Sequence, residues 1–456
     1  MRSTRHDPVS CAVRFGALLS ALLLGLAACA APEEAERGAQ EAEGDQPGAK
    51  GNAVRIGLVT FLSGNAAEPF GIPARDAATR IVDALNKGGA PAPYDQAGIG
   101  GRPIQTVIID ENGGPEQQVS EYRRLVLDQK VDVVIGYISS GDCSAVAPVA
   151  EELERLTVFF DCGTNAIFEE IDKNPTYVFR TAAHQIIDSV GAARYVTDKF
   201  PDASTVAGIN QNYAWGQDSW TAFSAAYRQL NKDATLATPL FPELYAGAYS
   251  PEVSTLLRGR PDVIHSSFWG GDLESFIVQS APRRLPEQST LVLTAADPLL
   301  PRLGEQVPSG LVVGARGPHG PFAPDNELNR WFKDVYQDVG VRPVYPAYHM
   351  AQAILGVKAA WEKAKADAGR EPTPDQVIKA FEGLEFDTPS GMIRMALGKG
   401  HQAVEPIAYG TTGEFDENTG EVAIEDIEEY PAECVNPPAG TPSTRWIQSG
   451  FPEAKC

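Results

Sequence analysis

Short β-rich runs alternate with helical periods along the chain from Val54 onward, and this alternation constrains the fold more than any other feature. The runs VRIGLVT (54–60), PIQTVIID (103–110), VDVVIG (131–136) and TVFF (157–160) predict strands. Between them, apolar residues recur at helical spacing, which predicts helices at 74–86, from Pro115 onward and at 145–155. Strands that alternate with helices are typical of a parallel sheet covered on both faces.

The same rhythm restarts after Phe179-Arg180-Thr181. Strands are expected near 205–209, 236–241, 262–266, 291–295 and 311–315, with helices at 186–200, 217–230 and 272–280. Helices near 326–339, 345–365 and 374–382 and strands at 392–397 and 407–411 complete the chain. A length of 456 residues allows two domains with a core each. We therefore predict an α/β protein with two doubly wound parallel-sheet lobes.

The N-terminus carries an export signal. Three arginines in the first fourteen residues precede an apolar stretch that is short for a membrane span, and residues 26–29 read Leu-Ala-Ala-Cys. This ending resembles the lipobox of bacterial lipoproteins, which predicts a signal peptide at 1–28 and lipidation of Cys29. Residues 29–53 are rich in Ala, Glu, Gly and Gln and are expected to form an acidic flexible tether. The alternative is an ordinary secretory signal with a chance cysteine.

The formal net charge of -22 limits the possible partners. An acidic surface repels phosphate backbones, so nucleic-acid binding is not expected. The N-terminal stretch is the one segment apolar enough for a membrane, which excludes a polytopic membrane protein.

Four cysteines remain after the signal and Cys29: Cys143, Cys162, Cys434 and Cys456. Four cysteines allow three pairings. Short loop closure in an oxidising compartment favours Cys143–Cys162 and Cys434–Cys456. Metal binding is the rival interpretation, but there is no CxxC spacing and no nearby histidine pair.

Motifs of catalysis do not occur. The sequence lacks HExxH, GxSxG and GxxxxGK[ST], and its six histidines are never at the spacing of metal ligands. We expect no catalytic residues, no metal and no cofactor. An exported enzyme that uses a cleft between lobes is the weaker alternative.

Aromatic and hydroxyl side chains gather in the segments that follow the predicted strands. Ligands of doubly wound sheets bind at these carboxyl ends, where loops lead into helix N-termini. Aromatic walls with a few polar anchors are the usual composition of a small-molecule pocket. The residues concerned are Phe70, Tyr137, Ser139, Ser140, Thr164, Tyr213, Trp215, Phe268 and Trp269.

An ordered set of segments resembles a known family. The segments are IGLVTFLSG (56–64), GIGGRPIQTVIIDENGGPEQ (98–117), VDVVIGYISSG (131–141), FFDCGTN (159–165), TYVFRTA (176–182), NQNYAWGQDSW (210–220) and AADP (295–298). Together they resemble the type I periplasmic solute-binding proteins of ABC importers, in the branched-chain amino-acid (leucine/isoleucine/valine-binding) class. The resemblance implies a periplasmic-binding-protein-like fold whose lobes are joined by three crossing strands and close on a solute.

By that resemblance, the crossings are expected near Arg180, near 314–317 and near 389–391. The first lobe would comprise 54–180 plus 317–388, and the second 181–314 plus 391–425. Residues 426–456 would form a C-terminal tail held by Cys434–Cys456.

The resemblance also assigns roles in the site. Ser140, Cys162 and Thr164 fall on the positions that hold a ligand carboxylate, and Asp297 falls on the acid that holds an ammonium group. Aromatic contacts fall on Phe70, Tyr213, Trp215 and Trp269, and Tyr137 belongs to the same group of loops. Ser140 and Thr164 could also cap helices, and Asp297 before Pro298 is typical of a helix start.

The chain departs from the family in one acid and in its cysteines. Asp161 stands beside the expected carboxylate site and could instead recruit a cationic or amide ligand. We therefore expect a small polar or amphipathic solute, such as an amino acid, an amide or an aromatic acid, captured by a monomer for an ABC permease. A sensory receptor of the same fold with a signalling partner is the alternative.

Overall fold

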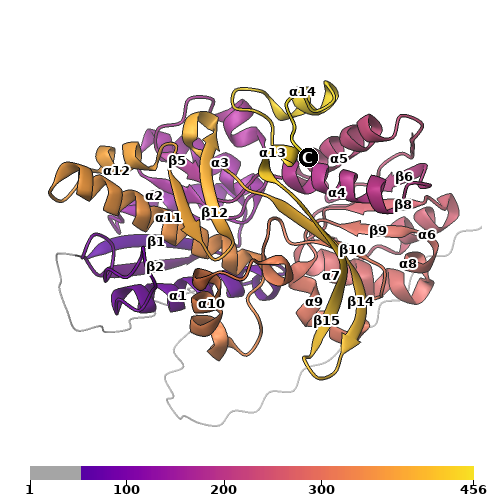
Figure 1. Ribbon diagram of the computed structural model, residues 1–456, viewed down its shortest axis with the longest axis horizontal. Coiled ribbons are helices and arrows are strands. Elements are labelled where there is room, and N and C mark those ends of the chain that lie inside the picture. Colours follow the sequence, from indigo (N-terminus) through magenta and orange to yellow (C-terminus); the bar gives the residue numbers. More distant parts are fainter. Residues whose placement is uncertain (1–52) are drawn as a thin grey trace, which may run out of the picture. The chain divides into compact units, whose positions relative to one another are not determined.

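A computed structural model describes residues 53–456, and Figure 1 shows the arrangement of its helices and strands. The expected signal peptide, Cys29 and nearly all of the tether lie outside the described residues. Two sheets carry the described fold, in the strand orders β11-β12-β13-β5-β4-β3-β1-β2 and β15-β14-β10-β9-β8-β6-β7. This confirms the predicted α/β class with two doubly wound lobes.

The first sheet has a parallel body and an antiparallel edge. Parallel pairing joins β5, β4, β3, β1 and β2, and also β13 to β5, whereas β11, β12 and β13 pair antiparallel. Its strands are β1 (Val54–Thr60), β2 (Ile104–Asp110), β3 (Val133–Gly136), β4 (Thr157–Phe159), β5 (Val178–Arg180), β11 (Glu385–Thr388), β12 (Gly391–Leu397) and β13 (Gln402–Val404).

The second sheet ends in a long hairpin. Parallel pairing joins β7, β6, β8, β9 and β10, and the antiparallel strands β14 and β15 extend it, as the yellow ribbon of Figure 1 shows. Its strands are β6 (Thr205–Gly208), β7 (Thr235–Leu236), β8 (Val263–Ser266), β9 (Thr290–Leu293), β10 (Val312–Gly314), β14 (Ile407–Asp416) and β15 (Glu421–Tyr430).

The helices follow the strands of their own lobe. The first-lobe helices are α1 (Ile72–Asn86), α2 (Pro115–Leu127), α3 (Ser140–Glu152), α10 (Glu327–Tyr336), α11 (Tyr345–Ala368) and α12 (Pro374–Phe381). The second-lobe helices are α4 (Ile186–Lys199), α5 (Ala214–Leu230), α6 (Ser250–Gly259), α7 (Gly270–Ser280), α8 (Leu285–Gln288) and α9 (Leu300–Leu303). In α1, the residues Ala74, Ala77, Ala78, Ile81 and Leu85 form the buried stripe that the helical period predicted.

The chain crosses between the sheets after β5, after β10 and between β13 and β14. The first two places agree with the expected crossings near Arg180 and 314–317. The third corrects the expected crossing at 389–391, because Pro389 and Ser390 are the turn that joins β11 to β12 within the first sheet. Residues 391–404 therefore belong to the first sheet, and the second sheet continues from 407 to 430.

The C-terminal segment packs on the second lobe. Two short helices, α13 (Ala432–Val435) and α14 (Ser443–Gln448), follow β15, and Trp446 is buried in one core with residues of α4 and α5. Both predicted disulfides, Cys143–Cys162 and Cys434–Cys456, are present. The tail thus starts after Tyr430 and is held on the second lobe by the Cys434–Cys456 disulfide and by the shared core.

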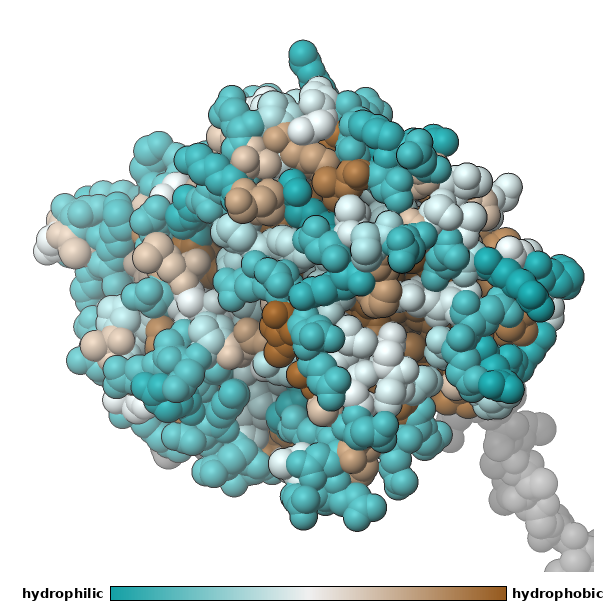
Figure 2. Space-filling view, turned by 45° about the vertical axis from the view of Figure 1, so that its right-hand side comes forward, coloured by the Kyte–Doolittle hydropathy of each residue, from teal (hydrophilic) through white to brown (hydrophobic). Residues whose placement is uncertain are grey.

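Hydrophilic residues dominate the face shown in Figure 2, where hydrophobic residues occur in small separate patches. Among residues 53–456, no helix combines the length and the apolar composition that a membrane crossing requires.

Candidate functional site

A small cavity lies where the loops of the two lobes meet. It offers about 10 Å³ to the centres of water molecules, which is about the space of one water. The first lobe supplies loops after β1, β3 and β4 and the start of α11, and the second lobe supplies the starts of α5 and α7. The lining residues are Phe70, Ile138, Ser140, Asp161, Gly163, Tyr213, Trp215, Trp269, Arg316 and Tyr345.

Aromatic rings form most of the cavity wall and make contact across the two lobes. The ring of Trp269 meets the edge of Phe70 at 5.3 Å between centroids, and Phe70 meets Tyr345 at 5.4 Å. The indole nitrogens are satisfied, because Trp269 Nε1 donates to Tyr213 Oη at 2.7 Å and Trp215 Nε1 donates to the carbonyl of Ser267 at 2.7 Å. The rings therefore have fixed orientations.

Ser140 ties together two loops of the first lobe. Its Oγ accepts from the backbone N–H groups of Gly163 and Thr164, at 3.2 and 3.1 Å. The Cys143–Cys162 disulfide joins α3 to the same loop. These backbone N–H groups are engaged within the protein, and the serine hydroxyl keeps its own hydrogen to donate.

Arg316 stands at the centre of the site, in the second crossing segment. Its Nη1 donates to the carbonyl oxygen of Asp161 at 2.6 Å and to Oδ1 of that residue at 2.7 Å, and its Nε lies 3.3 Å from Asp188 Oδ2. The guanidinium also lies 4.7 Å from the Trp215 ring centroid and 5.6 Å from that of Tyr345. Burial lowers the pKa of Arg316, but Asp161 and Asp188 outweigh it, so the net pKa is raised.

Among the residues that line the cavity, two buried side-chain polar atoms have no hydrogen-bond partner within residues 53–456. They are Arg316 Nη2 and Asp161 Oδ2, and both residues line the cavity. The Arg316 side chain is 5% exposed and that of Asp161 is 0% exposed. An unpartnered donor and an unpartnered acceptor thus face one small aromatic cavity, which is costly unless a ligand satisfies them.

His349 lies between Asp161 and the backbone of Arg316. His349 Nδ1 lies 2.7 Å from Asp161 Oδ1, and His349 Nε2 lies 3.1 Å from the carbonyl oxygen of Arg316. Both neighbours accept hydrogen bonds, whereas a neutral imidazole carries one N–H. Burial lowers the pKa of His349, and Asp161 opposes that effect. A neutral His349 therefore donates at only one of the two contacts.

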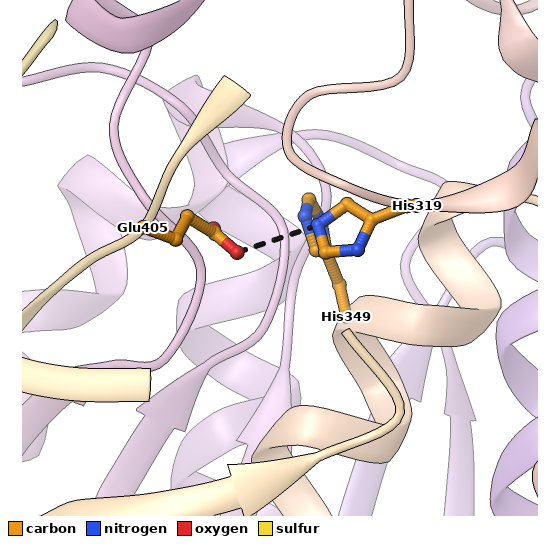
Figure 3. A group of neighbouring side chains, drawn as sticks. All are labelled: His319, His349 and Glu405. Carbon is orange, nitrogen blue, oxygen red and sulfur yellow. Dashed lines mark ion pairs between the residues drawn. The ribbon is translucent and has the colours of Figure 1, made fainter. Parts of the chain in front are cut away.

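Within residues 53–456, His319, His349 and Glu405 form the one group of side chains that could hold a metal ion. Their ligand atoms all lie within 4.8 Å of one another, and all three residues are buried. Figure 3 shows the two imidazoles against each other, with Glu405 directed at His319 at 3.5 Å from Nε2. In the present arrangement His349 has both nitrogens engaged, and His319 Nδ1 lies 2.6 Å from Ser390 Oγ. The two histidines are thus hydrogen-bonded to other residues, and His319 Nε2 has no hydrogen-bond partner in the described part of the chain.

The structure brings five of the nine predicted ligand residues to the cavity: Phe70, Ser140, Tyr213, Trp215 and Trp269. The other four are engaged elsewhere. Tyr137 packs against Phe159 in the core, and Cys162 is in the disulfide.

Thr164 and Asp297 are the remaining two. The Thr164 hydroxyl donates to Asp218 Oδ2 at 2.5 Å, across the lobes. Asp297 accepts from Arg342 Nη1 at 2.6 Å and from the backbone N–H of Tyr345 at 2.6 Å. The carboxylate of Asp297 thus holds the start of α11, which carries the cavity residue Tyr345.

Sequence reasoning missed Arg316 and Tyr345. Arg316 lies in GARGPHG (314–320), directly after a predicted strand, so its position was a signal that could have been used. Tyr345 starts a long helix and reads as a core residue by its spacing. Asp161 was recognised as an additional acid.

Comparisons with known proteins agree with this architecture. The sequence profile of a periplasmic binding protein family matches residues 53–414. A search of curated proteins gives no match. The similar solved structures include a solute-binding protein of an ABC transporter from R. palustris in complex with 4-hydroxybenzoate, with a TM-score of 0.70 and 18% identity over 84% of this chain and 98% of that one.

Two further structures illustrate the range of similar proteins. A second R. palustris solute-binding protein, in complex with benzoate, has a TM-score of 0.69 and 18% identity over 82% of this chain and 96% of that one. A leucine-binding protein from Thermotoga maritima has a TM-score of 0.67 and 17% identity over 82% of this chain and 98% of that one. With the match to four fifths of its sequence and its two crossing-linked α/β lobes, the chain belongs to the periplasmic binding protein family.

Proposed function

We propose that this solute-binding receptor captures an aromatic carboxylate that also carries a hydrogen-bond donor, and delivers it to the permease of an ABC importer. The observation that carries this proposal is the pair of unpartnered atoms, Arg316 Nη2 and Asp161 Oδ2, in a cavity walled by aromatic rings.

The chemistry of the cavity matches such a solute. A carboxylate is the natural acceptor for a buried guanidinium, and a hydroxyl or amino group is the natural donor for Asp161. Phe70, Trp215 and Trp269 supply flat faces against which an aromatic ring would pack, once the lobes have opened beyond the present one-water cavity and closed again on the solute. Similar proteins from R. palustris are complexes with 4-hydroxybenzoate and 3,4-dihydroxybenzoic acid, which have these groups and support the proposal.

Entry of the solute requires the lobes to separate. Phe70, Trp215, Trp269 and Tyr345 are each less than 5% exposed, and the cavity that they line has room for about one water, so a solute cannot enter the present arrangement. Separation about the three crossings would open it, and closure on the solute would remove water from the Arg316 and Asp161 contacts and strengthen them.

The location proposed for the receptor rests on its N-terminus. Export by residues 1–28 and lipidation of Cys29 would place the globule outside the cytoplasmic membrane, on the tether 29–53. There a monomer would meet the permease, and the compartment would maintain the two disulfides.

Calorimetric titration with four solutes tests the proposal. We expect 4-hydroxybenzoate to bind at least about tenfold more tightly, about 1.4 kcal/mol, than benzoate, which lacks the donor, or 4-hydroxybenzyl alcohol, which lacks the carboxylate. Trp269→Leu should weaken binding, whereas Trp331→Leu, on α10 and away from the cavity, should leave it unchanged. Leucine binding more tightly than 4-hydroxybenzoate would refute the aromatic assignment.

A further inference from the structure

Beside the cavity between the lobes, a hydrogen bond joins two side chains of different lobes. Thr164 lies in the loop after β4 of the first lobe, and Asp218 lies in the second turn of α5 in the second lobe. The Thr164 hydroxyl donates to Asp218 Oδ2 at 2.5 Å. Neither residue belongs to a segment in which the chain crosses between the lobes. The bond therefore depends on the two lobes being held together.

The first lobe fixes Thr164 for this contact. The backbone N–H of Thr164 donates to Ser140 Oγ at 3.1 Å, and its carbonyl oxygen accepts from Arg180 Nη1 at 2.7 Å. The hydroxyl oxygen also accepts from the backbone N–H of Ala166 at 3.1 Å, so the hydroxyl hydrogen is left to point at Asp218. A donor that is already ordered loses little freedom when the bond forms.

Asp218 lies on the same face of α5 as the cavity residue Trp215, because three residues separate them along the helix. The ring of Trp215 lies 4.7 Å from the guanidinium of Arg316, and its Cζ3 would lie 2.1 Å from a Cβ at Gly163. Gly163 is the neighbour of Thr164 in the chain. The hydrogen bond therefore fastens α5 to the same loop against which Trp215 packs.

The surroundings of Asp218 make the donor important for closure. Burial raises the pKa of Asp218, the hydrogen bond from Thr164 lowers it, and the charges of Glu170 and Glu169 raise it again. Contact between the lobes takes water away from this carboxylate, which is costly unless a donor replaces the water. The Thr164 hydroxyl supplies that replacement.

We propose that Thr164 and Asp218 form a closure latch, in which Asp218 is a positioning residue for solute binding. Neither side chain lines the cavity, so the pair acts through Trp215 and through the loop around Gly163. The latch stabilises the closed lobes and thereby keeps a captured solute between them. This inference rests on the capture by closure proposed above, and it identifies the pair that determines how firmly the lobes stay closed.

A double-mutant cycle tests the latch by calorimetric titration of the intact protein with 4-hydroxybenzoate. Asp218→Ala and Thr164→Val should each raise the dissociation constant about tenfold, because each removes a hydrogen bond to a charged group from the closed state. The double variant should also raise it about tenfold and not about a hundredfold, because the two side chains act through each other. Single effects that multiply in the double variant would overturn the proposal and assign Thr164 to the solute.

Two further variants distinguish the latch from a general loss of stability. Thr164→Ser keeps the hydroxyl and should bind 4-hydroxybenzoate within about twofold of the parent protein. Thr205→Val is the matched control, because Thr205 Oγ1 donates to Asp262 Oδ2 at 2.8 Å within the second lobe. It removes the same kind of hydrogen bond without changing a contact between the lobes, and it should leave the affinity unchanged. An equal loss of affinity in Thr205→Val would refute the latch.

Hydrogen exchange without solute tests the latch independently of the solute's identity. The backbone N–H of Gly271 in the second lobe donates to the carbonyl oxygen of Asn65 in the first at 3.0 Å, so its exchange reports separation of the lobes. We expect this exchange to be at least about threefold faster in Asp218→Ala, while β3 stays protected. Unchanged exchange at Gly271 would overturn the latch. Faster exchange, in a protein whose parent does not bind 4-hydroxybenzoate, would support the latch and refute the proposed solute.

Discussion

At the scale of single residues, the core of the site is a balance of charges around Arg316. One guanidinium faces two carboxylates, Asp161 and Asp188, and Nδ1 of the buried His349 lies 2.7 Å from Oδ1 of Asp161. Burial raises the pKa of Asp188 to about 7, although Arg316 opposes that effect. The protonation of this region therefore changes in the neutral range, and stability should depend on pH.

Glu405 is the residue at which this dependence is best tested. Burial raises its pKa to about 8, despite the hydrogen bond from the backbone N–H of Ala183. An unfolded chain releases this proton near pH 4.5, whereas the folded protein keeps it until about pH 8. The free energy of unfolding should consequently fall as the pH rises between these values, with a slope of up to about 1.4 kcal/mol per pH unit for one proton, and level off above them.

Glu405→Gln should flatten that slope, as measured by urea denaturation from pH 4.5 to 8.5. Asp188 would contribute the part of the slope that remains below pH 7. Glu327→Gln, which removes an exposed carboxyl on α10, is the matched control and should follow the parent protein. An unchanged slope in Glu405→Gln would show that this carboxyl ionises normally.

At the scale of elements, the C-terminal tail is the part that the sequence described least well. Residues 425–429 read as a solvated acidic face, and their acids are indeed exposed, but they lie in the strand β15, in which Val422 and Tyr430 are buried. Charged side chains are suited to an edge strand, because they discourage pairing with other chains. This run has too few apolar residues to predict a strand. Its strand structure depends on pairing with β14, which lies at its side in the sheet.

The Cys434–Cys456 disulfide should hold this tail on α4 and α5. It closes a loop with a sequence separation of 22 residues, for which chain entropy predicts roughly 2–4 kcal/mol of stabilisation. We expect Cys434→Ala/Cys456→Ala to lose that amount and to expose the backbone of 431–456 to rapid hydrogen exchange, measured by mass spectrometry.

Cys143→Ala/Cys162→Ala is the matched comparison, because its loop has a separation of 19 residues. Its effect should fall on α3 and the loop after β4, and the tail should remain protected. Rapid exchange in the tail of both double variants would indicate that the tail depends on global stability instead of its own disulfide.

Elements that depend on local pattern were predicted well, and contacts between distant residues were not. The parallel strands follow from β-rich runs that alternate with segments of helical periodicity. Both disulfides follow from the short loops that they close. The third crossing was misplaced because Thr-Pro-Ser-Gly at 388–391 reads as a break, while the partner strand that makes it a hairpin turn is visible only in the folded sheet. Asp297 was predicted to contact a ligand because the sequence around it gives no sign of its actual partner, Arg342, which lies 45 residues later in the chain.

At the scale of the whole molecule, closure of the lobes depends on a glycine. A Cβ at Gly163 would lie 2.1 Å from Trp215 Cζ3 and 2.7 Å from Arg316 Nη2, so no side chain fits there when the lobes are closed. Gly163→Ala should hold the lobes apart, and we expect affinity for the interlobe solute to fall at least tenfold while each lobe stays folded.

Small-angle scattering and calorimetry with 4-hydroxybenzoate check this prediction. The radius of gyration should stay at its solute-free value when the solute is added to Gly163→Ala. Gly141→Ala is the control, because its Cβ would meet Ser139 Oγ at 3.6 Å and Pro115 Cγ at 3.7 Å, which are ordinary contacts in the first lobe. Normal closure and affinity in Gly163→Ala would show that Trp215 moves aside.

The enclosed aromatic cavity has a kinetic consequence. Four of the five aromatic residues in the wall are buried, Tyr213 is partly exposed, and the rings of one lobe touch those of the other, so a captured molecule leaves only when the lobes separate. The residence time of the solute is then set by the rate at which the lobes open. The contacts between solute and protein affect its release only after the lobes have opened. A membrane partner that separates the two lobes would therefore control the release of the solute directly. Solutes of quite different affinity would leave at similar rates when this partner opens the lobes.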